Sequence, residues 1–317
     1  MIEVVKPGLS TTVQDAGREG YYDVGIPPSG ALDQFSLAAA NLLVGNDEGA
    51  AALEVAYLGP ELRFTTAAVV AVTGAELAPR VDGEERPLWE AFAVPAGAVV
   101  SFAHLRGGAR AYVAVGGGIA VPELLGSRST YALGSLGGLE GRALSAGDVL
   151  PVGPGGRLAG SVPEALRPTF GTDLEIRVVM ALYDHLLADD TFTESEWTLT
   201  PTAARVGFRY KGPRIPLVER EQPFGAGSDP SNIVDAPYPI GSIQIPGGVE
   251  PIVLHRDAVS GGGYAMIATV ISADMDAVAQ SAPGAKTRFV PVTLEAALAA
   301  RAQRRSRLER VREATSR

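Results

Sequence analysis

Short stretches of alternating apolar and polar residues fill most of the chain, and glycine or proline separates one stretch from the next. Alternation with a period of two is typical of half-buried strands, whereas glycine and proline mark turns. Residues 98–104 and 109–115 are two β-rich stretches on either side of Arg106 and two glycines, which predicts a hairpin. The first half of the chain is therefore expected to be mainly β.

One helix interrupts these strands, over residues 31–44. Leu32, Phe35 and Ala39 recur at helical spacing, so one face of the helix is expected to pack on a core. Ser29 is the expected N-cap, and Gly45 suits the left-handed conformation that ends a helix.

The second half begins again with strands after residues 151–168, a proline- and glycine-rich stretch with little apolar periodicity. We place the domain boundary there, which predicts one domain over residues 1–158 and a second over 159–317. The regular elements expected in the second domain are strands at 173–181, 243–245, 252–255 and 264–272 and a short helix at 275–280.

The C-terminal tail is predicted to be a helix that starts at residue 294, with Thr293 as its cap. Six arginines lie between Arg301 and Arg312. They are expected to face solvent, where positive charges near the end of a helix also complement its dipole.

The composition excludes several classes of function but says less about the fold. The chain has no cysteine, which excludes disulfides and thiolate chemistry, and its formal charge of −9 disfavours binding to nucleic acid. The sequence does not begin with a secretory pattern and has no uncharged apolar run of about 18 residues, so a cytoplasmic protein without a membrane span is expected.

The chain has only three lysines, Lys6, Lys211 and Lys286. None completes a glycine-rich phosphate-binding loop, and none lies between methionines as the lysine of a biotin carrier does. We therefore expect neither a P-loop ATPase nor a biotin carrier in this chain.

A first candidate site lies in residues 12–20, where polar side chains alternate with glycines. Glycine lets the backbone approach a ligand closely, and Asp15 and Arg18, next to the Gln14 amide, could orient a carboxylate, carbamate or phosphate group. The alternative is a turn in which Asp15 caps the backbone and pairs with Arg18.

The start of the predicted helix supplies a second candidate, Ser29 with Asp33. Free amides at a helix N-terminus favour anions, which would make both residues ligand contacts. Helix capping explains the two residues without any ligand.

A third candidate sets three hydroxyl groups around one arginine in a glycine-rich loop, at Ser127, Arg128, Ser129 and Thr130. These groups could cradle a planar anion or an amide. A long loop that satisfies its own polar groups is the alternative, but so many polar groups between apolar strands favour a function.

The fourth candidate, in the second half, combines Gln244, Asp257 and Tyr264. If the amide and the carboxylate face each other across a barrel pocket with Tyr264 at its rim, they could bind an amide-bearing substrate and share a proton with it. A buried hydrogen-bond network is the alternative. The three histidines lack metal-ligand spacing, so no metal site is expected.

Several long motifs in order carry a family resemblance: TVQDAGREGYYDVGIPPSGALD, ANLLVGN, LGSRSTYALGSLGGLEGRALSAGD and GSIQIPGGVEPIVLHRDAVSGGGYAMIATVISADMDAVAQSAPG. They resemble the family of biotin-dependent carboxyltransferases and the C-type subunits of 5-oxoprolinase, also called allophanate hydrolase subunit 2, over residues 6–290. Where that family often has Thr-Gly-Gly-Tyr, this chain has three glycines between Ser260 and Tyr264, so the hydroxyl is displaced.

The resemblance implies a mainly β fold of two tandem cyclophilin-like β-barrels with a few short helices. It also implies a hydrolase subunit that opens 5-oxoproline to glutamate with ATP. Its partners would be a B-type subunit (allophanate hydrolase subunit 1, Kip inhibitor type) and a lactam-utilisation protein as the A-type subunit. ATP would act through the complex, and the isolated chain would be inactive.

Two other functions stay open under the resemblance. One is transfer of a carboxyl group from carboxybiotin, on a separate carrier, to urea or a related amide. The other is non-catalytic regulation of the B-type partner. The residues nominated as catalytic are Asp257, Gln244 and Arg128, and those nominated for substrate binding are Gln14, Asp15, Arg18, Ser29, Asp33, Ser127, Ser129, Thr130 and Tyr264.

Overall fold

The computed structural model describes residues 1–316. The chain divides into two compact units, each built from more than one segment. Unit 1 comprises Met1–Glu19, Ser29–Phe170 and the described residues from Arg305 on, and unit 2 comprises Gly20–Pro28 and Gly171–Arg304. Unit 1 thus continues twelve residues beyond the boundary predicted after residue 158, and a nine-residue segment of the N-terminal half belongs to unit 2.

The mainly β class with few helices is confirmed. Unit 1 contains two antiparallel sheets, with strand orders β11-β1-β4-β9-β6-β7 and β2-β3-β10-β5-β8. The strands of the first sheet are β1 (Ile2–Lys6), β4 (Glu61–Phe64), β6 (Pro79–Val81), β7 (Glu84–Glu85), β9 (Val99–Phe102) and β11 (Val149–Leu150). Those of the second are β2 (Ser10–Gln14), β3 (Ala52–Ala56), β5 (Ala68–Gly74), β8 (Ala91–Val94) and β10 (Arg110–Val115).

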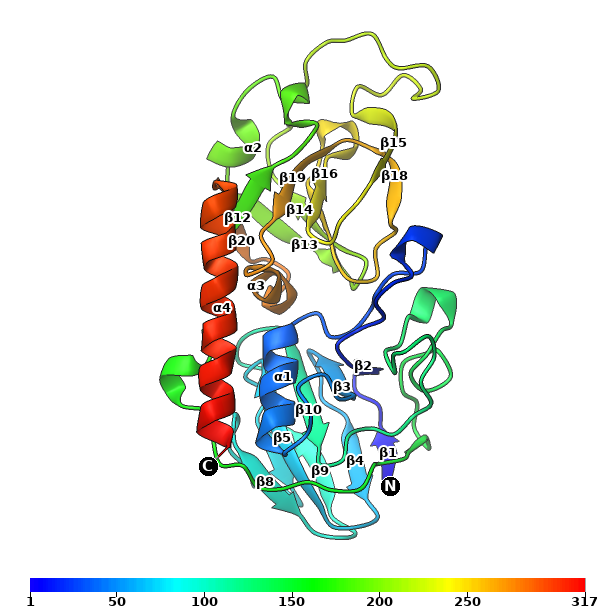
Figure 1. Cartoon of the computed structure of the whole chain (residues 1–317), viewed down its shortest axis with the longest axis vertical. Helices are drawn as coiled ribbons and strands as arrows, with labels where there is room; N and C mark the ends of the chain where they lie inside the picture. The colour runs from blue at the N-terminus through cyan, green and yellow to red at the C-terminus, as the bar shows by residue number, and fades with distance from the viewer. Residues whose placement is uncertain (317) are drawn as a thin grey trace. The chain divides into compact units, whose positions relative to one another are not determined.

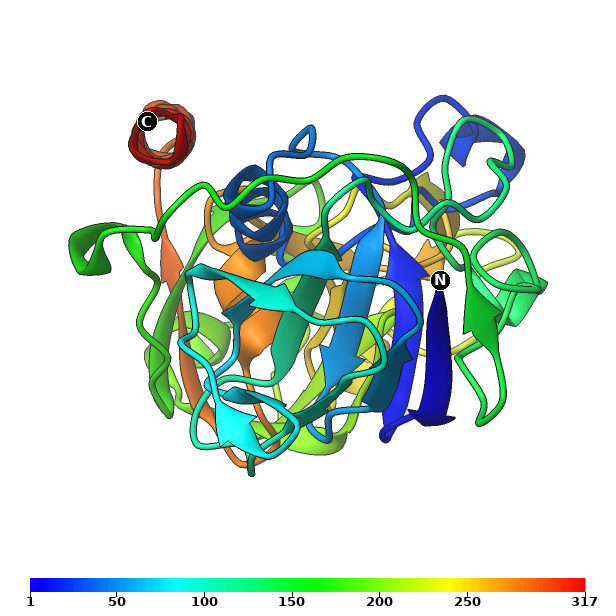
Figure 2. The same ribbon diagram turned by 90° about the horizontal axis from the view of Figure 1, so that it is seen from below.

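The two sheets of unit 1 share one apolar core. Val4 and Phe64 from the first sheet and Leu53 and Val113 from the second are fully or almost fully buried in a single cluster. Every residue of β10 is buried, because α1 (Gln34–Leu43) covers the other face of this central strand. Figure 1 shows α1 alongside β5 and β10, and Figure 2 shows the same helix nearly end-on.

The helix predicted at residues 31–44 is confirmed, but it begins three residues later and has a different cap. Asp33, not Ser29, is the N-cap, and its Oδ1 accepts a hydrogen bond from the Ser36 N–H at 2.8 Å. Ser29 instead has a positive φ of 51°, so the chain turns there before the helix starts. Gly45 has the expected left-handed φ of 77°.

The hairpin predicted around Arg106 is wrong. β9 pairs with β4 and β6 in the first sheet, whereas β10 pairs with β3 and β5 in the second. The connection between β9 and β10 therefore carries the chain from one sheet to the other. Locally, such a connection has the same apolar flanks and glycines as a hairpin turn.

Unit 2 is a closed barrel with a two-stranded sheet beside it. The barrel order is β12-β19-β16-β17-β14-β13-β20, and it closes through the parallel pair β12 and β20. The barrel strands are β12 (Asp173–Met180), β13 (Trp197–Ala203), β14 (Gly207–Lys211), β16 (Ser242–Gln244), β17 (Ile252–Leu254), β19 (Met266–Val270) and β20 (Lys286–Pro291). The two-stranded sheet pairs β15 (Asn232–Pro237) with β18 (Gly261–Tyr264).

Most of the predicted elements of the second half are present. β16 and β17 form the expected antiparallel pair, and α3 (Met275–Gln280) has the predicted bounds. The run predicted as one strand at 264–272 is divided between the end of β18 and β19, which belong to different sheets. A four-residue helix, α2 (Thr191–Glu194), was not predicted.

The tail helix α4 (Leu294–Thr315) is confirmed, and the Thr293 hydroxyl accepts from the Ala296 N–H at 3.2 Å. The expectation that its arginines face solvent is only partly right. In unit 2, Arg304 Nε donates to Asp276 at 2.5 Å, and in unit 1, Arg307 Nε donates to the Leu166 carbonyl at 2.9 Å. Among the described residues, no helix combines the length and apolar character needed to span a membrane.

Candidate functional site

In unit 1, the Asp15 carboxylate binds the loop that contains the hydroxyl residues Ser127 and Ser129. The Ser127 and Ser129 hydroxyls donate to its Oδ1 at 2.7 and 2.5 Å, and the Arg128 N–H donates to Oδ2 at 2.5 Å. The Gly17 N–H donates to Oδ1 at 2.8 Å. Hydrogen bonds to a charged acceptor are the stronger kind, so this one buried carboxylate fixes segments more than 110 residues apart in sequence.

The segment that precedes α1 meets the same residues. The Ala31 N–H donates to the Asp15 carbonyl at 2.9 Å. A Cβ on Gly30 would lie 2.8 Å from the backbone of Gly17, so only glycine permits this close approach. The structure therefore brings buried Ser29 to the first candidate site.

Arg18 holds the other side of the hydroxyl loop. Its Nη2 donates to the Ser129 carbonyl at 2.9 Å and its Nε to the Leu124 carbonyl at 3.2 Å. The side chain is only 1% exposed. Because guanidinium cannot be deprotonated in a protein, Arg18 places a permanent positive charge beside the predicted substrate loops.

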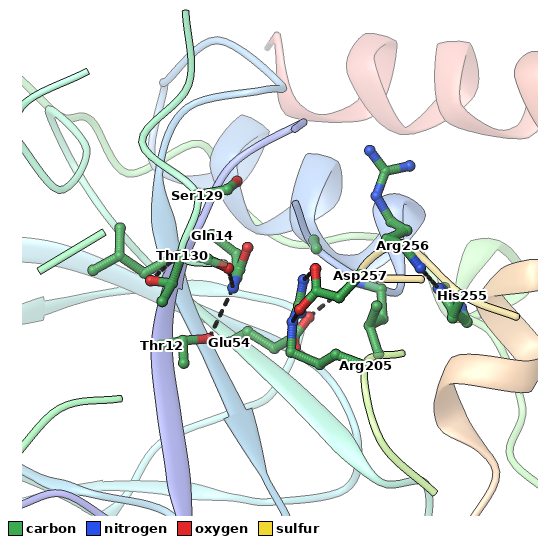
Figure 3. Close-up of polar contacts among 12 residues, drawn as sticks. Thr12, Gln14, Glu54, Ser129, Thr130, Arg205, His255, Arg256 and Asp257 are labelled. Atoms are coloured by element: carbon green, nitrogen blue, oxygen red, sulfur yellow. Dashed lines mark hydrogen bonds and ion pairs between the residues drawn. The ribbon is translucent and has the colours of Figure 1, made fainter. Parts of the chain in front are cut away.

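Gln14 ends β2 and faces the same loop. Its Nε2 donates to the Thr130 carbonyl at 3.0 Å and to the Thr12 hydroxyl at 3.1 Å (Figure 3). Thr130 is itself held, because its N–H and hydroxyl both donate to the Val13 carbonyl at 3.0 Å. Gln14 and Thr130 are both almost completely buried.

Two nominated side chains, those of Arg128 and Asp33, have partners within the chain. The Arg128 guanidinium is bound to the Val121 carbonyl and, at 2.6 Å, to Glu123, so its backbone rather than its side chain meets Asp15. The Asp33 carboxylate accepts from both the N–H and the hydroxyl of Ser36, as a helix cap does. The nomination of both residues for the site stays a prediction.

A buried charged cluster on the five-stranded sheet was missed by the sequence analysis. Glu54 Oε2 accepts from the Tyr112 hydroxyl and from the Leu32 N–H, each at 2.8 Å, and Arg110 Nε lies 4.0 Å from Oε1. Tyr112 in turn accepts from the Asp33 N–H at 2.8 Å. A lone glutamate inside the apolar run of β3 is the signal that could have revealed the cluster.

Burial and neighbouring negative charges determine the protonation state of Tyr112 in this cluster. Burial raises the pKa of Tyr112 well above its ordinary value, and the carboxylates of Glu54 and Asp33 raise it further. Tyr112 is therefore a neutral hydrogen-bond donor to Glu54 at physiological pH.

In unit 2, Gln244 and Tyr264 come together around a residue that the sequence analysis did not nominate. The Tyr238 hydroxyl donates to the Tyr264 carbonyl and accepts from the Tyr264 N–H, each at 2.7 Å. Burial raises the pKa of Tyr238, whereas hydrogen bonding with the Tyr264 backbone and the Gln244 side chain lowers it. Tyr22, from the segment Gly20–Pro28, donates to the Tyr238 carbonyl at 2.6 Å.

Asp257 has a different partner. Its carboxylate accepts from Arg205 Nε at 2.8 Å and Nη2 at 3.1 Å, a two-point ion pair that is mostly buried (Figure 3). Asp257 lies in the turn after β17 rather than on a barrel strand. The predicted arrangement of Gln244 opposite Asp257 across one pocket stays a prediction.

A groove of about 500 Å³ lies elsewhere in unit 2, at the start of β12 and β20, and contains none of the nominated residues. Its lining consists of Asp173, Leu174, Glu175, Glu196, Lys286, Thr287 and Arg288. Over residues 1–316, no three His, Asp or Glu side chains are grouped as a metal site requires.

The chain matches the family described as "Carboxyltransferase domain, subdomain A and B" over residues 24–291. It belongs to this family. Over 306 residues it is 37% identical to the C-type subunit of the 5-oxoprolinase of Escherichia coli, and the match covers 95% of this chain and 94% of that protein.

Members of the carboxyltransferase domain family also occur within larger enzymes. The chain is 36% identical over 308 residues to the urea amidolyase of Saccharomyces cerevisiae, and the match covers 93% of this chain but only 17% of that protein. The crystal structure of the urea carboxylase of Kluyveromyces lactis has a TM-score of 0.93 at 34% identity, covering 98% of this chain and 29% of that one. The relatives are thus either a subunit of an enzyme or a longer enzyme chain of which the match covers one segment.

Proposed function

We propose that this chain is a subunit of an ATP-dependent 5-oxoprolinase, which acts with A-type and B-type partner subunits. The observation that carries the proposal is the 37% identity to the C-type subunit of the Escherichia coli 5-oxoprolinase, which extends over 94% of that protein. In the reaction, water breaks the lactam C–N bond of 5-oxoproline to give glutamate, and ATP is hydrolysed to ADP and phosphate.

We propose that the loops of unit 1 around Asp15 bind the small substrate. They present buried amide, hydroxyl and guanidinium groups, which can bind the carboxylate and the amide of a lactam. Ser127 and Ser129 act through Asp15, which they help to fix, and Thr130 acts through Gln14.

Catalytic roles are proposed for Asp257 and Gln244 in unit 2. The two-point pairing of Asp257 with Arg205 gives it a fixed orientation, and Gln244 is near the Tyr238 hydroxyl. Arg128 keeps a supporting role through its backbone N–H. We propose that ATP is bound through the complex, because none of the three lysines lies in a phosphate-binding loop.

A second candidate function is transfer of a carboxyl group from carboxybiotin to urea or a related amide. The TM-score of 0.93 with the Kluyveromyces lactis urea carboxylase favours it. This function requires biotin on a separate carrier protein.

Reconstitution separates the two functions. The chain is purified and mixed with A-type and B-type partners. ATP hydrolysis is assayed with 5-oxoproline, and carboxyl transfer is assayed separately with urea plus a carrier whose biotin has been carboxylated beforehand. The proposal predicts ATP hydrolysis that requires 5-oxoproline and all three chains. Turnover only with urea and the carrier would establish carboxyl transfer instead, and partner binding without either activity would leave the regulatory role.

A further inference from the structure

The orientation of the Gln14 amide is fixed by its partners. A carbonyl oxygen can only accept a hydrogen bond, so the Gln14 group that lies 3.0 Å from the Thr130 carbonyl must be the nitrogen. The same nitrogen donates to Thr12 at 3.1 Å. Figure 3 shows this nitrogen directed toward Thr12 and Thr130 and the oxygen on the other side of the amide.

The Gln14 oxygen is thereby left without a donor. Gln14 is 0% exposed, and its Oε1 accepts no hydrogen bond from any group in the described chain. An unpaired buried acceptor disfavours the folded state, and native proteins keep few of them. Both donor contacts of the amide hold this oxygen in place, so the acceptor is built into the unit 1 loops.

We infer that Gln14 Oε1 accepts a hydrogen bond from an N–H of the substrate and so determines specificity for amides over esters. The inference rests on the proposed function, because it concerns the same unit 1 loops. A lactam or urea N–H would satisfy the buried oxygen. A lactone or a carbonate diester has no N–H and places an oxygen lone pair at that position, where it repels Oε1 and leaves it unpaired.

The test compares matched pairs of ligands in the complex with the partner subunits. Dissociation constants are measured by calorimetry for 5-oxoproline and its ring-oxygen lactone analogue, and for urea and dimethyl carbonate, which has no N–H. The wild-type complex is expected to prefer the N–H member of the pair that it binds by about 10- to 100-fold. In Gln14→Met the preference is expected to fall to less than about threefold.

Gln34→Met is the control, because it removes a second glutamine amide of unit 1, which is only partly buried and whose Nε2 donates to the Ala31 carbonyl. It should keep the wild-type preference. If Gln14→Met does not fold, the side-chain NH₂ signal of Gln14 in wild-type protein labelled with ¹⁵N answers the question. It should shift more with the N–H ligand than with the oxygen analogue.

The outcomes separate the inference from the proposed function. If urea is bound but 5-oxoproline is not, the oxoprolinase proposal fails, and the urea pair still decides the role of Gln14. An unchanged preference in Gln14→Met, equal binding of both members by the wild type, or no binding of either N–H ligand would overturn the inference.

Discussion

Asp15 shows how much of unit 1 depends on a single residue. Its carboxylate accepts four hydrogen bonds, from Gly17, Ser127, Arg128 and Ser129. Ser127 and Ser129 were predicted from the sequence to bind substrate and Arg128 to be catalytic, and the residue types and glycine spacing were sufficient to locate the cluster. It could not show that Asp15 binds the loop itself, since that depends on a contact across more than 110 residues of sequence.

Asp15→Ala is expected to lower the free energy of unfolding by about 3 kcal/mol, because it leaves buried donors of the hydroxyl loop without an acceptor. Urea denaturation measures the loss. Asp23→Ala, at an exposed position, is the matched control and should leave the unfolding midpoint unchanged. Equal stability of the two variants would mean that Asp15 does not hold the loop.

Two tyrosines of unit 1, buried Tyr112 and partly buried Tyr57, make a second comparison. Tyr112→Phe removes a hydroxyl that bonds both Glu54 and the Asp33 N–H, so it should cost about 2 kcal/mol. The Tyr57 hydroxyl is buried and has no hydrogen-bond partner in the described chain. Tyr57→Phe is therefore expected to be neutral or stabilising by up to about 1 kcal/mol. Thermal unfolding of both variants measures the contrast.

Tyr112 also predicts a pH dependence. Burial raises its pKa in the folded state, so the folded protein retains a proton that the unfolded chain releases near pH 10. This contribution to stability is complete below pH 10 and is lost as the pH rises through the folded pKa. Between about pH 10 and 11.5, Tyr112→Phe should reduce the loss of unfolding free energy by up to about 1.4 kcal/mol per pH unit. Parallel wild-type and mutant curves would contradict this.

At the scale of elements, local sequence predicted the strands and helices better than their pairing. α1, α3 and the β16–β17 pair follow from apolar periodicity and turn residues, and the start of α4 follows from its Thr293 cap. The hairpin between β9 and β10 fails because the choice of sheet depends on which strands each one pairs with, and several strands of similar apolar character compete for each position. The start of α1 was misplaced because Ser29 and Asp33 are both good caps, and only the turn at Ser29 decides between them.

The segment Gly20–Pro28, here called the strap, supports a specific prediction about its anchoring. It belongs to unit 2, where the Tyr22 hydroxyl donates to the carbonyls of Tyr238 and Val259 at 2.6 and 3.2 Å. Tyr22→Phe removes these bonds and should speed amide hydrogen exchange in the strap about fivefold.

The neighbouring Tyr21 supplies the control. Tyr21 and Tyr22 are both partly buried, so Tyr21→Phe is a matched change within the strap. Exchange followed by mass spectrometry should distinguish Tyr22→Phe from Tyr21→Phe. The same rate in both variants would show that the Tyr22 hydroxyl does not anchor the strap.

For the whole molecule, the sequence predicted two β-rich halves but not how the chain is shared between them. Unit 1 takes the last part of α4, and unit 2 takes the strap, so each unit contains residues from the other half of the chain. Long-range packing decides which unit a segment joins, so the local pattern of apolar and polar residues does not reveal it. The strap joins two predicted substrate segments, since it follows Arg18 closely and immediately precedes Ser29.

The central claim is that the loops gathered by Asp15 hold the small substrate, and hydrogen exchange in the assembled complex tests it most directly. Exchange is measured with and without saturating 5-oxoproline, and with urea in parallel. The account predicts slower exchange in peptides that cover residues 14–18, 29–33 and 124–130 of this chain when the substrate binds. Protection confined to the partner subunits, with these three segments unchanged, would contradict it.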